Sequence, residues 1–133
     1  DRWLKFEGQY GQGVPWVIQK AGVEALTNPK ARTEMTEYMT ELEHRRDIML
    51  EGLNRLGLQC KPLQATPYIW AKVPEGRDDE SFALDKLLGE AHIAVMPGSY
   101  FGDSGKGYVR LTLFFSREDA EEALRRIEAV RDW

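Results

Sequence analysis

The stretch "FGDSGKGYVRLTLFFS" (residues 101–116) predicts a β-strand with two unlike faces. Side chains alternate across a strand, so one face is wholly apolar: Val109, Leu111, Leu113 and Phe115. The other face carries Tyr108, Arg110, Thr112 and Phe114. Two interpretations of Arg110 stay open. Its stem covers Tyr108 or Thr112 on an open sheet face, or its guanidinium borders a cleft and binds a carboxylate there.

Two helices are predicted upstream of the strands. Apolar residues recur at helical spacing from Val14 to Leu26, and the sequence "TNP" (residues 27–29) ends that helix. A second helix is predicted over residues 30–56, with Gly57 as its C-terminal cap. Its length exceeds that of most globular helices, which indicates a bend or a helix that links two bodies. Residues 1–13, rich in glycine and glutamine, are predicted to be a loop or linker.

The rest of the chain predicts a small sheet with two further helices. Short strands are predicted over residues 58–60, 66–73 and 93–95. A helix follows from Phe82 to about Ala91, and residues 96–107 are predicted to be a glycine-rich loop. Ser116 begins the last helix in a capping box with Asp119. We therefore expect an α+β two-layer sandwich: a small, mostly antiparallel sheet covered by helices and preceded by a long linking helix.

Composition narrows the range of functions. The 133 residues suffice for one ordinary domain, and a net charge of −4 argues against nucleic acid as a partner. No apolar run has the length of a membrane span, and no signal-peptide pattern stands at the start. Cys60 is the only cysteine, which predicts a reducing, cytoplasmic location. The chain opens at Asp1 without methionine, so we expect a fragment of a longer polypeptide.

Other chemistries find little support in the sequence. "GDSGKG" (residues 102–107) departs from a phosphate-binding loop, because Tyr100 stands where the first glycine is needed and a strand follows instead of a helix. His44, His92 and Cys60 share no metal-ligand spacing. A Ser-His-Asp site stays open, although no nucleophile elbow is present.

Four segments in register resemble one enzyme family. "PGSYFGDSGKGYVRLTLFFSREDAEEALRRI" (residues 97–127) resembles the end of the fold-type I, class I and II aminotransferases, which use pyridoxal phosphate. The matching upstream segments are "VIQKAGVEALTNP" (17–29), "RRDIMLEGLNRLGL" (45–58) and "ATPYIWAKVP" (65–74). The resemblance spans nearly all of the chain and is closest to the aspartate and diaminopimelate aminotransferase branches.

The resemblance implies a domain plan and a site. Residues 1–29 would be an interdomain or dimer-interface segment with a short helix, and residues 30–133 the C-terminal small domain of a longer enzyme. Arg110 matches the arginine that binds the substrate α-carboxylate in this family. Pro67, Tyr100 and Phe101 are expected to line the cleft, although relatives often carry an aromatic residue at the Pro67 position.

The resemblance also implies what this chain lacks. The Schiff-base lysine and the main phosphate-binding residues belong to the family's large domain, and no lysine here lies in that motif. We expect a homodimeric pyridoxal phosphate enzyme that acts on an amino acid and a 2-oxo acid, with this chain inactive alone. Two alternatives remain: a non-catalytic α+β module that binds a small carboxylate or regulates, and a regulator in which an aminotransferase-like domain is fused to a DNA-binding region.

Overall fold

A computed structural model describes residues 2, 5 and 13–133 of the chain. The predicted loop over residues 1–13 therefore lies largely outside the described residues. The chain divides into two compact units, Asp1–Met39 and Thr40–Trp133, and we describe each by itself. The boundary between them falls within one long helix, α3 (Pro29–Arg55).

The first unit contains α2 (Trp16–Thr27) and the beginning of α3. Pro15 stands at the N-cap of α2, and Asn28 separates the two helices. The Asn28 side-chain oxygen accepts a hydrogen bond from the Lys30 backbone N–H at 2.8 Å, as an N-cap residue does. No side chain of α2 is buried. Both predicted helices are confirmed to within two residues at each end.

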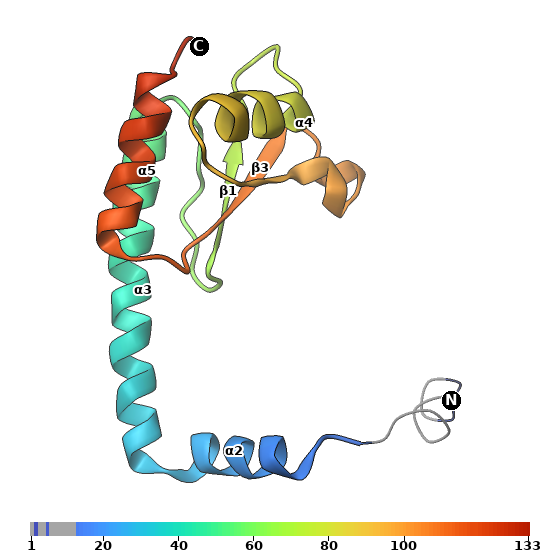
Figure 1. Ribbon diagram of the computed structural model, residues 1–133, viewed down its shortest axis with the longest axis vertical. Helices are drawn as coiled ribbons and strands as arrows, with labels where there is room; N and C mark the ends of the chain where they lie inside the picture. Colours follow the sequence, from blue (N-terminus) through green and yellow to red (C-terminus); the bar gives the residue numbers. More distant parts are fainter. Residues whose placement is uncertain (1, 3–4, 6–12) are drawn as a thin grey trace. The chain divides into compact units, whose positions relative to one another are not determined.

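The second unit is an α+β fold built on a three-stranded antiparallel sheet, as predicted. The strands are β1 (Tyr68–Lys72), β2 (Met96–Pro97) and β3 (Tyr108–Thr112), in the order β1-β3-β2. The last helix, α5 (Arg117–Ala129), lies beside the second half of α3 (Figure 1). Its predicted capping box between Ser116 and Asp119 is confirmed. The remaining turns of helix are α4 (Asp79–Ser81), η1 (Phe82–Glu90), η2 (Gly98–Phe101) and η3 (Asp103–Gly105).

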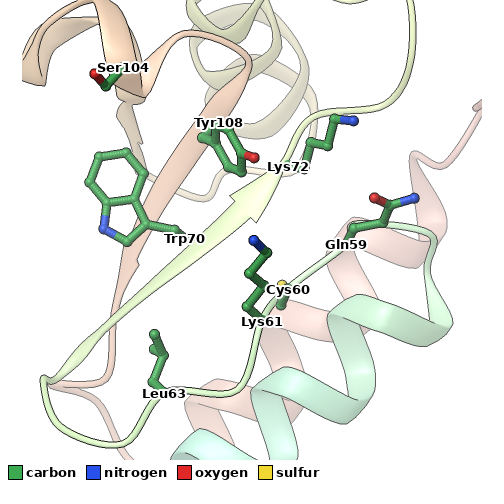
Figure 2. Close-up of a pocket in the computed structure, with 8 residues that line it drawn as sticks. All are labelled: Gln59, Cys60, Lys61, Leu63, Trp70, Lys72, Ser104 and Tyr108. Carbon is green, nitrogen blue, oxygen red and sulfur yellow. The ribbon is translucent and has the colours of Figure 1, made fainter.

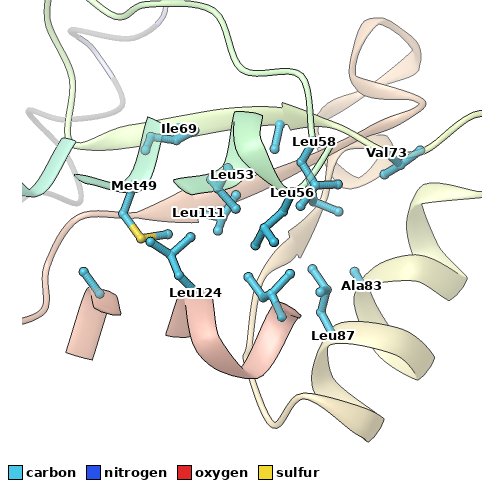
Figure 3. Close-up of a cluster of buried hydrophobic side chains, with 14 of the residues drawn as sticks. Met49, Leu53, Leu56, Leu58, Ile69, Val73, Ala83, Leu87, Leu111 and Leu124 are labelled. Atoms are coloured by element: carbon cyan, nitrogen blue, oxygen red, sulfur yellow. The ribbon is translucent and has the colours of Figure 1, made fainter. Parts of the chain in front are cut away.

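The hydrophobic core lies between the helices and one face of the sheet (Figure 3). Met49 and Leu53 of α3 are buried against it, together with Leu111 of β3. Helices α3 and α5 approach closely at Gly52, where an added Cβ would collide with the Leu124 side chain. The predicted apolar face of β3 is thus the inner face of the sheet. The face of β3 that carries Arg110 is the outer face.

Two strand predictions were wrong in position or extent. Residues 93–95 form no strand, because the Ile93 N–H donates to the Leu87 carbonyl at 2.8 Å and closes the end of η1. The strand is Met96–Pro97, inside the predicted loop, and proline is tolerated there because β2 is an edge strand. Residues 58–60 contribute only a single bridge, from Cys60 to Ala71.

Candidate functional site

Arg110 lies on the outer face of the sheet, as the alternation in β3 predicted. Val109 and Leu111 on either side of it are buried in the core, while Arg110 is half-buried. Its guanidinium carbon lies 4.4 Å from the centre of the Tyr68 ring and 4.2 Å from the centre of the Phe101 ring. Both distances are within the range of cation–π attraction. Two aromatic rings from different segments therefore hold the cation in place.

The guanidinium of Arg110 has no acceptor of its own in the described part of the chain. Every ion pair found among residues 13–133 joins other side chains. The side chain of Arg110 forms no hydrogen bond with these residues. A guanidinium carries five N–H donors in a planar fork. Fixed by aromatic rings and unpaired, this fork is available to an external carboxylate or phosphate.

A small pocket opens beside Arg110. Its volume is ≈ 200 Å³, and its lining is mostly apolar: Tyr68, Ala94, Val95, Met96, Arg110 and Thr112. Pockets that enclose a ligand usually measure roughly 300–1,000 Å³. The pocket is smaller than this range, and Arg110 is the one cation that the described residues contribute to its mostly apolar lining.

The structure places the other predicted site residues differently. Phe101 stacks against Arg110. The Tyr100 hydroxyl instead donates to Glu80 Oε1 at 2.9 Å, a bond that raises the pKa of Tyr100. Pro67 accepts a hydrogen bond from the Leu113 N–H at 2.8 Å, next to the start of β1. None of Phe101, Tyr100 and Pro67 lines the pocket beside Arg110, and the place of all three on a complete cleft stays a prediction.

Sequence reasoning missed three neighbours of Arg110. Trp70 of β1 and Met96 of β2 are its direct partners in the sheet register, and Tyr68 supplies one of the two stacked rings. Alternation along residues 66–73 already puts Tyr68 and Trp70 on one face. Only the pairing of β1 with β3 shows that this is the face of Arg110.

A second pocket, of ≈ 430 Å³, includes Trp70 in its lining (Figure 2). It is lined by Gln59, Cys60, Lys61, Leu63, Trp70, Lys72, Ser104 and Tyr108. Burial raises the pKa of the Cys60 thiol to about 12, so the thiol stays protonated at neutral pH and is a poor nucleophile. The Cys60 thiol therefore does not mark this pocket as a reaction centre.

The buried lysine of the second unit is not a nucleophile either. Lys86 Nζ donates to Glu90 Oε2 at 2.7 Å and to Asp132 Oδ2 at 2.9 Å. These bonds raise the pKa of Lys86, so the amine is charged at neutral pH. No group of three His, Cys, Asp or Glu side chains in the described residues could hold a metal ion. No helix among them is both long and apolar enough to cross a membrane.

Comparisons with known proteins agree on one family. The family model described as aminotransferase class I and II matches residues 9–127. An LL-diaminopimelate aminotransferase of Prochlorococcus marinus is 36% identical over 128 residues, which cover 96% of this chain and 31% of that protein. The enzyme of the same name from Halothermothrix orenii is 43% identical over 117 residues, 87% of this chain and 29% of that protein.

A solved structure shares the fold. The aromatic aminotransferase from Pyrococcus horikoshii superposes with a TM-score of 0.89 at 32% identity, over 97% of this chain and 35% of that one. The chain thus spans about a third of the length of the relatives that it matches.

Proposed function

The chain belongs to the aminotransferase class I and II family, and on this premise we propose that it is the C-terminal part of a pyridoxal phosphate enzyme. That enzyme moves an amino group between an amino acid and a 2-oxo acid. Residues 30–133 are its small domain, and residues 1–29 belong to an interdomain or dimer-interface segment. Almost the whole chain matches about a third of each relative, which supports the proposal that it is one part of a longer enzyme.

The role that we assign to this part is to bind the substrate α-carboxylate through Arg110. The observation that carries the proposal is the unpaired guanidinium stacked between Tyr68 and Phe101 at the wall of a pocket. A planar fork accepts both oxygens of a carboxylate in parallel hydrogen bonds. Because the rings restrict the plane of the fork, they also restrict the orientation of the bound carboxylate. Orientation of this kind lowers the barrier of the step that follows.

The described residues do not by themselves fit pyridoxal phosphate. When bound, the cofactor supplies an electron sink for carbanions at the amino-acid Cα, and it needs a lysine amine that can become neutral. The buried Lys86 does not meet that need, because Glu90 and Asp132 hold it as a cation, and no other lysine of this chain matches the Schiff-base motif of the family that it resembles. We therefore assign no step at the cofactor to this chain, and we propose that the 133 residues alone do not transaminate.

The substrate class follows from what the relatives share. Their names point to different amino acids: LL-diaminopimelate for two of them and aromatic amino acids for the solved structure. All of these amino acids carry an α-carboxylate. A residue in the part of the fold that the relatives share is therefore best suited to bind this group. The names of the two sequence relatives favour an amino-acid substrate of the diaminopimelate type. We assign no residue to the recognition of its side chain.

The proposal includes a homodimer in the cytoplasm. The exposed apolar side chains of α2 support the homodimer, since Trp16 is 71% exposed and Leu26 is 75% exposed. Apolar surface of this kind is typical of interaction sites. The lone cysteine agrees with a reducing compartment.

The experiment that tests the proposed function uses two substrates on the full-length enzyme. An α-amino acid and the amine that lacks its carboxylate are compared on wild type and on Arg110→Lys. A loss confined to the amino acid supports the role of Arg110 in binding the carboxylate.

A further inference from the structure

The loop between β2 and β3 carries Phe101 to the guanidinium of Arg110. Its two short helical turns, η2 and η3, are joined at Gly102, which has φ 107°. The backbones of Gly98 and Gly105 are in such close contact that a Cβ on either would collide with a carbonyl oxygen of the other. The loop therefore closes on itself, and its ends decide where Phe101 lies.

One buried carboxylate binds both ends of this loop. Asp79, at the first residue of α4, is 3% exposed. Its Oδ2 accepts the Ser99 N–H at 2.8 Å and its Oδ1 accepts the Gly107 N–H at 3.1 Å. Burial by itself raises the pKa of Asp79, but these backbone bonds outweigh it and hold the pKa below its ordinary value. The carboxylate is thus charged, and each oxygen accepts one backbone amide.

Both bonds anchor segments that carry residues of the site. Ser99 stands two residues before Phe101, within the same turn η2. Gly107 immediately precedes β3, the strand that carries Arg110. The carbonyl of Gly107 accepts the Val73 N–H at 3.0 Å. A shift at either end would change the distance between the Phe101 ring and the guanidinium, which is now 4.2 Å.

We propose that Asp79 is a positioning residue for substrate binding: by bonding Ser99 and Gly107 it holds Phe101 against Arg110 and so sets the orientation of the carboxylate fork. This inference rests on the proposed role of Arg110. Asp79 touches no substrate, since its side chain is enclosed by the loop that it anchors. On this proposal its effect passes through the contact of Phe101 with Arg110 and concerns the carboxylate of the substrate.

The test uses Asp79→Asn in the full-length enzyme. The variant keeps the shape of the side chain but replaces one acceptor by an NH₂ donor, which faces a backbone N–H. We expect kcat/KM for an α-amino acid to fall about tenfold, mainly through a higher KM, as a ~1.4 kcal/mol loss of binding would give. The matching amine without a carboxylate should be affected less than twofold.

Two further variants make the test specific. Asp103→Asn makes the same chemical change in the same loop, on a side chain that is 94% exposed and paired only with Lys106, and should leave both substrates unaffected. Phe101→Leu removes the stacked ring and should reproduce the selective loss. The double variant Asp79→Asn with Phe101→Leu should be no worse than the stronger single variant, because residues that act through one contact are not additive.

Each outcome separates this inference from the proposed function. Equal losses for both substrates in Asp79→Asn, or losses that multiply in the double variant, overturn the positioning role. If Arg110→Lys is selective in the same assay, the proposed function then still stands. Should Asp79→Asn not fold, Ser99→Pro removes the N–H that Oδ2 accepts, and Ser99→Ala, which keeps this N–H, is the control for the loss of the hydroxyl. A selective loss in Ser99→Pro supports the inference, and equal losses or none overturn it.

Discussion

Arg110 of β3 lies directly opposite Trp70 of β1 in the antiparallel register. Aromatic rings surround this position on the outer face of the sheet: the Trp70 ring lies 5.5 Å from Phe101 and 6.4 Å from Tyr108, measured between ring centres. Arg110 forms no ion pair with the described residues, which agrees with its proposed role of binding a substrate carboxylate.

The contact of α3 with the start of α5 should depend on pH through Glu41. Arg117 and Arg45 bind this carboxylate and lower its pKa to about 2. A lowered pKa in the folded state stabilises the protein above the unfolded pKa, and that contribution is lost as the pH falls toward 2. Glu41→Gln should therefore lower the urea midpoint at pH 7, and the difference from wild type should shrink as the pH falls from about 4 to about 2.

The control for Glu41 is Glu51→Gln, on the same helix. Glu51 is exposed and has no ion pair among the described residues, so its replacement should leave the midpoint nearly unchanged. An equal effect of both substitutions at pH 7 would show that helix charge, and not the Arg117 contact, decides the stability. Arg117 also contacts His44 Nδ1 at 2.8 Å, so each variant is compared with wild type at the same pH.

The packing of α3 on α5 should not tolerate a methyl group at Gly52. A Cβ there would overlap the side chain of Leu124, which is only 7% exposed. Overpacking of this kind costs about 1–3 kcal/mol, against a gain of up to about 1 kcal/mol in helix propensity. We expect Gly52→Ala to lower the free energy of unfolding. Gly22→Ala in α2, where the added Cβ meets nothing within 4 Å, should instead increase helicity by circular dichroism, and a stabilised Gly52→Ala would contradict the packing.

The separated 133-residue chain should associate through α2. Its exposed apolar side chains include Trp16 and Leu26, and association covers such surface. Light scattering at increasing concentration should give a mass above that of the monomer, and Trp16→Lys with Leu26→Lys should reduce it. Gln19→Lys with Gly22→Lys adds the same two charges to the same helix without removing an apolar side chain and should not reduce the mass. A monodisperse monomer at high concentration would contradict this expectation.

Local patterns in the sequence predicted the elements that short-range rules determine. The alternation around Arg110 and the capping box at Ser116 both depend on neighbours in the chain, and both are confirmed. The strand predicted over residues 93–95 was wrong because the end of η1 takes Ile93 into a helix-terminal bond. Branched residues favour a strand, but they do not reveal where a preceding helix stops.

The surroundings of Arg110 depend on contacts between distant segments. In the sequence, Asp79 is indistinguishable from an ordinary acidic residue at the start of a helix. In the structure it binds the backbone of Ser99 and Gly107, 20 and 28 residues away. The pairing of Tyr68 with the guanidinium likewise requires the sheet register. Sequence patterns carry no direct signal for such pairs, which is why Arg110 was predicted and its aromatic neighbours, apart from Phe101, were not.

The most direct test of the central claim is the substrate comparison on Arg110→Lys in the full-length enzyme. Lysine keeps the charge but loses the planar fork, so kcat/KM for an α-amino acid should fall ~100-fold or more, which corresponds to ~3 kcal/mol of lost carboxylate binding. The amine without the carboxylate should lose far less, and the content of bound pyridoxal phosphate should stay at the wild-type level. Equal losses for the two substrates would contradict the claim and would make Arg110 a residue of the fold or of a domain interface.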